Sequence, residues 1–228
     1  PDEFRQHMTY LQDNNFHVLP LETVIAALQS GSPLPDKTAV ITFDDGYISV
    51  YDTAFPLLVE MNYPFTVFVT AGLVNSNPKL YATWDQLREM GNKGATLANH
   101  TVSHPYLLER LPGDSDELWL EAVQQEIVSA EQSILEETGQ SHKLVAYPYG
   151  EYNLQIQELV STLGYVGIGQ HSGPISAASD FTALPRFPFS GIYAAMGTYI
   201  TKVNSLALNV SIAEPATVIT DSTSPWAE

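Results

Sequence analysis

Apolar residues along the chain follow two alternating patterns, which predict a repeated order of strand and helix. Short apolar runs are typical of strands, and apolar residues that recur every three or four positions are typical of amphipathic helices. The apolar runs predict strands at 16–19, 38–43, 65–69, 95–99, 143–147, 165–169 and 183–187. The helical spacing predicts helices at 3–14, 21–29, 47–61, 83–91, 116–137, 153–164 and 191–203. Such alternation favours parallel strands joined by right-handed crossovers. We therefore predict an α/β fold, a distorted (β/α)7-type barrel over residues 1–204, with an open doubly wound sheet as the alternative.

Local signals refine these elements. Thr83 and Gln86 have the spacing of a capping box at a helix start. Residues 38–43 (TAVITF) form a continuous apolar run, which is typical of a strand buried on both faces. Pro56 indicates a kink or a boundary in the helix that follows. The tail at 205–228 has a β-like pattern and could begin a further module.

Polar motifs stand directly after three of the predicted strands. They are Asp44-Asp45-Gly46 after 38–43, the HTVSHP segment 100–105 after 95–99, and Pro148-Tyr149-Gly150 after 143–147. Because the carboxyl ends of parallel barrel strands open onto one face, side chains far apart in sequence can meet there. We predict the active site at that face.

Asp44 and Asp45 are adjacent carboxylates, which repel each other unless a positive charge lies nearby. A divalent cation would supply that charge, with one carboxylate binding the ion and the other facing the substrate. Gly46 permits the tight turn that follows. The alternative is that the pair caps a helix beginning at Tyr47, where aspartate is also favoured.

His100 and His104 strengthen the metal interpretation, because imidazole is a favoured ligand of zinc and similar metals. Pro105 disfavours the α conformation at His104, so we expect a turn and not a regular helix. Together with Asp45, the ligand set is two histidines and one aspartate, which leaves coordination positions open for water and substrate. Zinc (Zn²⁺) is the default ion, and nickel, cobalt or iron would also fit.

The third motif is Tyr147-Pro148-Tyr149-Gly150. Its functional interpretation is that the backbone N–H of Tyr149 points at a developing oxyanion while the rings of the motif, including Tyr147 and Pro148, line a sugar site. A Pro-Tyr-Gly sequence after a strand can equally form an ordinary turn.

Composition narrows the classes of function. The chain has 228 residues, 26 acidic and 9 basic, and its net charge of −17 disfavours nucleic acid as a partner. The same charge fits plain solubility, a neutral substrate or a substrate with cationic amines. The absence of cysteine excludes disulfides, thiolate zinc sites and cysteine nucleophiles. No apolar run has the length of a transmembrane segment, and we expect a monomer.

The three motifs together resemble those of a known family. TFDDGY at 42–47, HTVSHP at 100–105 and YPYG at 147–150 are similar, in this order, to the motifs of the polysaccharide deacetylases of carbohydrate esterase family 4, also called the NodB-homology fold. The resemblance extends from about residue 38 to 190. It is closest to the branch that acts on poly-β-1,6-N-acetylglucosamine.

The resemblance implies a function and roles for individual residues. The implied reaction is hydrolytic removal of acetate from a polysaccharide that contains N-acetylglucosamine. Asp44 is then the general base, and Asp45, His100 and His104 bind the metal. The implied location is extracellular, periplasmic or in the cell envelope, the signal segment not being present in this chain.

Two departures from the family pattern concern catalytic partners. Many members carry an arginine where this chain has Ala146, and Arg186 from a neighbouring strand could substitute for it; a surface ion pair is the alternative. The general-acid histidine of the family is missing from any obvious late motif. Either His171 acts in its place, or the histidine lies upstream of Pro1.

Aromatic side chains suit contacts with sugar rings. Trp84, Tyr106 and Phe187 are candidates for such contacts, together with Phe189. Trp119 lies within the longest predicted helix and is expected in the core.

Three other classes fit part of the pattern. Non-haem iron oxygenases also use two histidines and a carboxylate, but the second adjacent aspartate and the α/β alternation disfavour them. A phosphatase with an aspartate nucleophile would require a DxD spacing and basic phosphate contacts, and the chain has only 9 basic residues. The last alternative is a catalytically weak or inactive carbohydrate-binding protein that retains the deacetylase fold.

Overall fold

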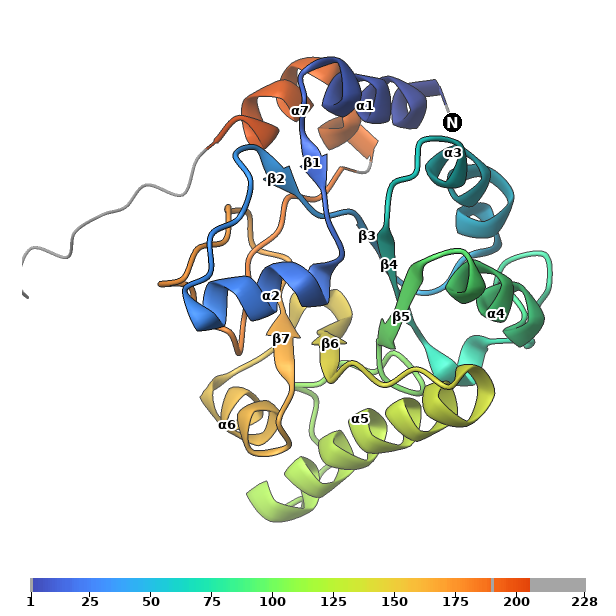
Figure 1. The fold of residues 1–228 in the computed structure, drawn as a ribbon. Helices are drawn as coiled ribbons and strands as arrows, with labels where there is room; N and C mark the ends of the chain where they lie inside the picture. Colours follow the sequence, from blue (N-terminus) through green and yellow to red (C-terminus); the bar gives the residue numbers. More distant parts are fainter. Residues whose placement is uncertain (1, 190, 206–228) are drawn as a thin grey trace, which may run out of the picture.

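Five parallel strands form a curled sheet in which each strand pairs with the next one along the chain (Figure 1). The computed structural model describes residues 2–189 and 191–205. The strands of the sheet are β3 (Thr42–Phe43), β4 (Phe65–Val69), β5 (Ala95–Asn99), β6 (Leu144–Ala146) and β7 (Val166–Ile168), and a separate parallel pair consists of β1 (His17–Val18) and β2 (Thr38–Ala39). A doubly wound sheet would reverse its strand order at a switch point. The order in the described residues does not reverse, so the predicted α/β barrel-type class is confirmed.

Helices surround the curled sheet, with α3 to α6 on its outside and α1 beside α7 near β1 (Figure 1). The α-helices are α1 (Asp2–Asp13), α2 (Leu21–Ser30), α3 (Phe55–Glu60), α4 (Trp84–Asn92), α5 (Asp116–Thr138), α6 (Leu154–Thr162) and α7 (Met196–Val203). A short π-helix, η1, spans Val50–Ala54. The 3₁₀ helices are η2 (Ala71–Leu73), η3 (Pro148–Gly150) and η4 (Gly191–Ala194). The predicted capping box is present at the start of α4, where the Thr83 hydroxyl accepts from the Gln86 N–H and the Gln86 side chain accepts from the Thr83 N–H.

The predicted strand at 38–43 is divided in the structure. β2 pairs with β1, whereas β3 pairs with β4, so the chain passes from one sheet to the other at residues 40 and 41. The four strand residues are only partly buried. The expectation of one strand buried on both faces is therefore wrong, because each half has a different neighbour.

The last predicted strand, at 183–187, is also wrong. It is reduced to a single parallel bridge between Ile168 and Leu184. Pro185 has no backbone N–H, which limits any continuation of the ladder beyond this point. The β-like tail predicted at 205–228 lies, from residue 206 onward, outside the residues that the structure describes.

The predicted helix at 47–61 is irregular. Its central part is the π-helical turn η1, in which the Phe55 N–H reaches back to the Val50 carbonyl. Pro56 follows and lacks the N–H that an α-helical bond would use. The predicted break at Pro56 therefore takes the form of a change from π-helix to α-helix.

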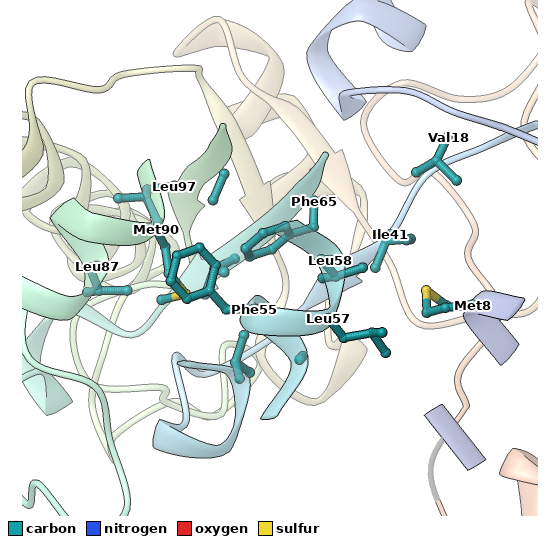
Figure 2. Close-up of a cluster of buried hydrophobic side chains, with 14 of the residues drawn as sticks. Met8, Val18, Ile41, Phe55, Leu57, Leu58, Phe65, Leu87, Met90 and Leu97 are labelled. Atoms are coloured by element: carbon teal, nitrogen blue, oxygen red, sulfur yellow. The ribbon is translucent and has the colours of Figure 1, made fainter. Parts of the chain in front are cut away.

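A large cluster of buried apolar side chains lies between α1, α3, α4 and the strands β4 and β5 (Figure 2). All five residues of β4 are buried, which is typical of a parallel strand covered on both faces. Phe43 and Phe65 pack edge to face with ring centroids 6.0 Å apart. This cluster fixes β3 against β4 and so determines where the residues after β3 emerge.

We expect replacement of Leu58 by alanine to lower the free energy of unfolding by about 2–5 kcal/mol, because truncation of a buried leucine leaves a cavity. Leu58 is 0% exposed, in α3 within this cluster (Figure 2). Urea unfolding followed by circular dichroism measures the change. The matched control is Leu154→Ala at a position that is 83% exposed, where a change within about 0.5 kcal/mol is expected. Equal stability of the two variants would contradict the burial of Leu58 in this cluster.

Trp119 lies in the core, as predicted. It is 3% exposed, and its Nε1–H donates to the Leu107 carbonyl at 2.9 Å.

Within the ranges 2–189 and 191–205, no helix has both the length and the apolar character required to cross a bilayer.

Candidate functional site

Three side chains converge where β3 and β5 end. Oδ1 of Asp45 lies 3.4 Å from Nε2 of His100 and 3.3 Å from Nε2 of His104. One candidate ligand atom of each residue lies within 4.8 Å of the other two. Tetrahedral ligands about 2.1 Å from an ion lie about 3.4 Å from one another. The separations and the donor types therefore fit a divalent metal ion.

The orientation of His100 suits metal binding. Its Nδ1 lies 2.8 Å from the carbonyl oxygen of Ala146 at the end of β6, and the side chain is 1% exposed. A carbonyl oxygen only accepts hydrogen bonds, so Nδ1 carries the proton and donates it. In the neutral ring with this tautomer, Nε2 presents its lone pair toward Asp45. This pairing of a ligand histidine with a backbone acceptor is a common support of metal sites.

Strained backbone is concentrated around this site. Four residues other than glycine have positive φ there: Asp45 (69°), Thr101 (65°), His104 (57°) and Tyr149 (55°). The conformation at His104 agrees with the predicted turn before Pro105. Residues in this region of backbone space persist only where surrounding contacts hold them, and they are frequent at functional sites.

The protonation states also suit a metal. Burial by itself raises the pKa of Asp45, but the contact with His100 and the charges of His100 and His104 lower it overall. The pKa of His104 is lowered, first because burial disfavours the charged ring and second because His100 is close. Near neutral pH, the geometry therefore offers an ionised carboxylate and a neutral His104 imidazole, the states that bind metal ions.

Asp44 points to a different partner. Arg186 Nη1 donates to Asp44 Oδ1 at 2.7 Å, and Nη2 donates to Oδ2 at 2.6 Å. The Arg186 Nε–H also donates to the Gly169 carbonyl at 2.9 Å. The two side chains are 18% and 23% exposed, so this contact is not the surface ion pair of the alternative interpretation. The helix-cap alternative is also contradicted, because Asp44 binds Arg186 and Asp45 faces the two imidazoles.

A cleft of about 450 Å³ opens over the site. It is lined by Asp44, Asp45, Tyr47, Leu73, Tyr81, His100, Ser103, His104, Tyr149 and Gln170. The structure thus brings five predicted site residues together in one cavity. The lining residues that were not predicted from the sequence are chiefly aromatic or polar. Tyr47 is the last residue of the TFDDGY motif, and that position was the signal that could have indicated it.

Two stacked tyrosine pairs lie at the cleft. Tyr47 and Tyr81 stack with centroids 5.4 Å apart and an interplanar angle of 14°, and Tyr106 and Tyr149 stack at 4.2 Å and 7°. Tyr47 follows β3 and Tyr149 follows β6, whereas His100 and His104 follow β5, which lies between those two strands in the sheet. Tyr106 is 53% exposed, so its outer face is accessible.

Tyr147 and Pro148 require a correction. Both are buried, and the Tyr147 side chain is 0% exposed, with its hydroxyl donating to the Thr182 carbonyl at 2.6 Å. Burial also raises the pKa of the Tyr147 hydroxyl. Tyr147 directly follows β6 and points into the core, whereas Tyr149 lies in the turn η3, where its positive φ of 55° takes the chain out of the strand conformation, and it lines the cleft. The predicted sugar contacts of Tyr147 and Pro148 are therefore wrong.

Trp84, Phe187, Phe189 and His171 do not line the cleft either, and Phe189 packs against the large core cluster. Trp84 is partly buried against the large core cluster. The ring of Phe187 lies near Lys202, whose Nζ is 5.8 Å from the centroid of that ring. His171 is exposed, and its Nδ1 lies 3.4 Å from the hydroxyl of Tyr152. Its neighbour Gln170 does line the cleft, so His171 stands next to the site without being part of its wall.

The fold and this cleft belong to a recognisable class. The family model described as polysaccharide deacetylase matches residues 31–168, which include β3 to β7 and the aspartates and histidines of the cleft. The chain therefore belongs to the polysaccharide deacetylase family, a class of hydrolases. The family resemblance predicted from the three motifs is confirmed.

Individual relatives agree with this assignment. The Bacillus subtilis (strain 168) protein YxkH is 29% identical over 87% of this chain and 68% of its own length. The poly-beta-1,6-N-acetyl-D-glucosamine N-deacetylase of Escherichia coli (strain K12) is 25% identical over 80% of this chain, and the match spans 32% of that enzyme. Among solved structures, the Streptococcus pyogenes deacetylase PplD in complex with acetate has a TM-score of 0.78 and 26% identity, covering 90% of this chain and 87% of that chain.

Proposed function

We propose that this chain is a metal-dependent enzyme that hydrolyses N-acetyl groups of an N-acetylglucosamine polysaccharide and releases acetate. The observation that carries the proposal is the convergence of Asp45, His100 and His104 in one cleft with the carboxylate of Asp44. Zinc is the default ion for two imidazoles and a carboxylate, and nickel, cobalt or iron suit the same ligands.

The residues of the cleft can be given separate roles. A bound divalent cation would supply Lewis-acid activation of the amide and of water. Asp44 accepts the proton of the attacking water, and Arg186 keeps both oxygens of that carboxylate in position. The backbone N–H of Tyr149 donates to the oxyanion as the carbonyl becomes tetrahedral. The C–N bond then breaks, acetate leaves, and the sugar amine takes a proton, for which His171 beside the cleft is the candidate donor.

The stacked tyrosines support a carbohydrate substrate. Sugar rings have apolar faces that pack on aromatic rings, and the two pairs flank the histidine ligands in strand order. The name of the Escherichia coli relative favours poly-β-1,6-N-acetylglucosamine over chitin oligomers or peptidoglycan, which present the same acetyl group. Since such polymers lie outside the cytoplasm, we also propose an extracellular, periplasmic or cell-envelope location.

Replacement of Tyr106 by alanine is expected to raise KM about 3- to 10-fold with little change in kcat, because an aromatic contact contributes about 0.5–1.5 kcal/mol of binding that does not depend on the reaction step. Tyr106 is exposed and stacks on Tyr149, which lines the cleft. Tyr193→Ala is the matched control, since that ring is 50% exposed and lies near Lys202. Steady-state kinetics on an acetylated oligosaccharide give both constants. An unchanged KM would exclude Tyr106 from substrate binding.

Acetate release is the direct test of the proposed function. The purified chain is first assayed for bound metals by elemental analysis. It is then incubated with β-1,6-linked N-acetylglucosamine oligomers, chitin oligomers and peptidoglycan fragments, with and without a chelator. Release of acetate that stops after chelation and returns with zinc supports the proposal. A protein that binds metal and oligosaccharide but releases no acetate from any of them is a carbohydrate-binding protein that retains the fold.

A further inference from the structure

The segment between the two histidine ligands has an unfavourable backbone conformation. Thr101 and His104 both have positive φ, at 65° and 57°. Thr101 is β-branched, and such residues rarely adopt this conformation. The side chains of His100 and His104 can face Asp45 together only while this turn is held, so some other part of the molecule must hold it.

Glu126, on the inward side of α5, makes the principal contacts with this turn. Its Oε2 accepts from the backbone N–H groups of Val102 and Ser103, both at 2.9 Å. Its Oε1 accepts from the Ser103 hydroxyl, also at 2.9 Å. One carboxylate therefore binds three donors from two consecutive residues that stand between the metal ligands, and hydrogen bonds to a charged acceptor are stronger than those to a neutral one.

Other contacts place the same turn against neighbouring elements. Asn99 Oδ1 accepts from the Thr101 N–H at 2.8 Å, and Asn99 Nδ2 donates to the Ile127 carbonyl of α5 at 2.7 Å. On the opposite side, the Gly72 N–H donates to the Val102 carbonyl at 2.8 Å. A Cβ at Gly72 would lie 2.6 Å from that oxygen, so only glycine allows the approach. The turn is thus held between α5 and η2.

We propose that Glu126 is a positioning residue of the metal site, whose carboxylate holds residues 101–104 in the conformation that aims His100 and His104 at Asp45. This inference rests on the proposed metal site and adds to it a residue that contacts neither metal nor substrate. Because the carboxylate acts on the backbone between the ligands, its loss should weaken metal binding in protein that is still folded.

The test compares zinc affinity in variants of the whole chain, by competition with a chromophoric chelator. Glu126→Gln keeps the size of the side chain but leaves one acceptor oxygen where two are used, and Glu126→Ala removes both. Each is expected to weaken zinc binding about 10- to 100-fold, as is typical for residues that support metal ligands. Ser103→Ala, which removes one of the three bonds, should weaken it about 2- to 10-fold. Glu121→Gln removes an exposed charge from the same helix and should leave affinity unchanged.

The outcomes separate this inference from the proposed function. Wild-type protein that binds no zinc refutes the metal site and the role of Glu126 with it. Wild-type protein that binds zinc, with Gln and Ala variants that bind equally well, refutes the role of Glu126 alone. A lower melting temperature of the metal-free variants combined with wild-type zinc affinity would also refute it, since it shows a purely structural role. Should Glu126→Ala fail to fold, the Gln and Ser103→Ala variants decide the question by the same criterion.

Discussion

Replacement of Asp44 by asparagine is expected to lower kcat for acetate release by about 100- to 10,000-fold, the range typical of a lost general base. Asparagine has the size of aspartate and can still bind Arg186 through one oxygen, but it cannot accept a proton from water. Because Asp44 binds Arg186 and not the two imidazoles, metal content should remain at the wild-type level. Acetate release at saturating substrate and elemental analysis of the same preparation measure the two effects. An Asp44→Asn enzyme within tenfold of wild type would show that another group is the base.

A double-mutant cycle extends this prediction to Arg186. If Arg186 acts only by orienting Asp44, then Arg186→Met should lower kcat in the wild-type background and have little further effect when Asp44 is already asparagine. Residues in direct contact typically show such coupling, whereas independent sites add. Additive effects would mean that Arg186 contributes to catalysis by some other route.

The second large effect is expected at Asp45. Asparagine at this position should weaken zinc binding by more than about 100-fold, beyond the loss usual for residues that only support ligands, and should abolish acetate release. The carboxylate oxygen lies 3.3 to 3.4 Å from both imidazole nitrogens, and a neutral amide lacks the charge that completes this site. The competition assay with a chelator gives the affinity. Asp52→Asn is the matched control, because Asp52 is an exposed aspartate of η1. Stoichiometric zinc in the Asp45 variant would contradict the assignment of this ligand.

Most elements of the fold could be predicted from the chain, and the failures have local causes. The capping box at Thr83 and the strand β4 depend on neighbouring residues, so their sequence patterns were sufficient. The division of the 38–43 run depends on which strands lie beside it, which no pattern within the run records. The missing strand at 183–187 could have been anticipated from Pro185.

Some residues of the candidate site could likewise be predicted from the sequence, and others could not. Residue chemistry and the position of motifs after strands predicted Asp45, His100 and His104, because few residue types bind divalent metals and parallel strands deliver their carboxyl ends to one face. Tyr147 was misplaced because its motif suggested the cleft, whereas the direction of its side chain at the end of β6 puts it in the core. Tyr81 was missed because only the tertiary structure stacks it on Tyr47.

The order of most strands and helices and the kinds of side chain available for a metal could be predicted from the amino-acid sequence, since these depend on local periodicity and residue chemistry. The three motifs carried the resemblance to the family. The distant groups that support these side chains became evident from the folded arrangement of the elements. Arg186 meets Asp44 across 142 positions, and Glu126 reaches the turn between the histidines from a helix 23 to 24 positions away. Such contacts depend on how whole elements pack against one another, and packing is a property of the folded chain that no single segment encodes.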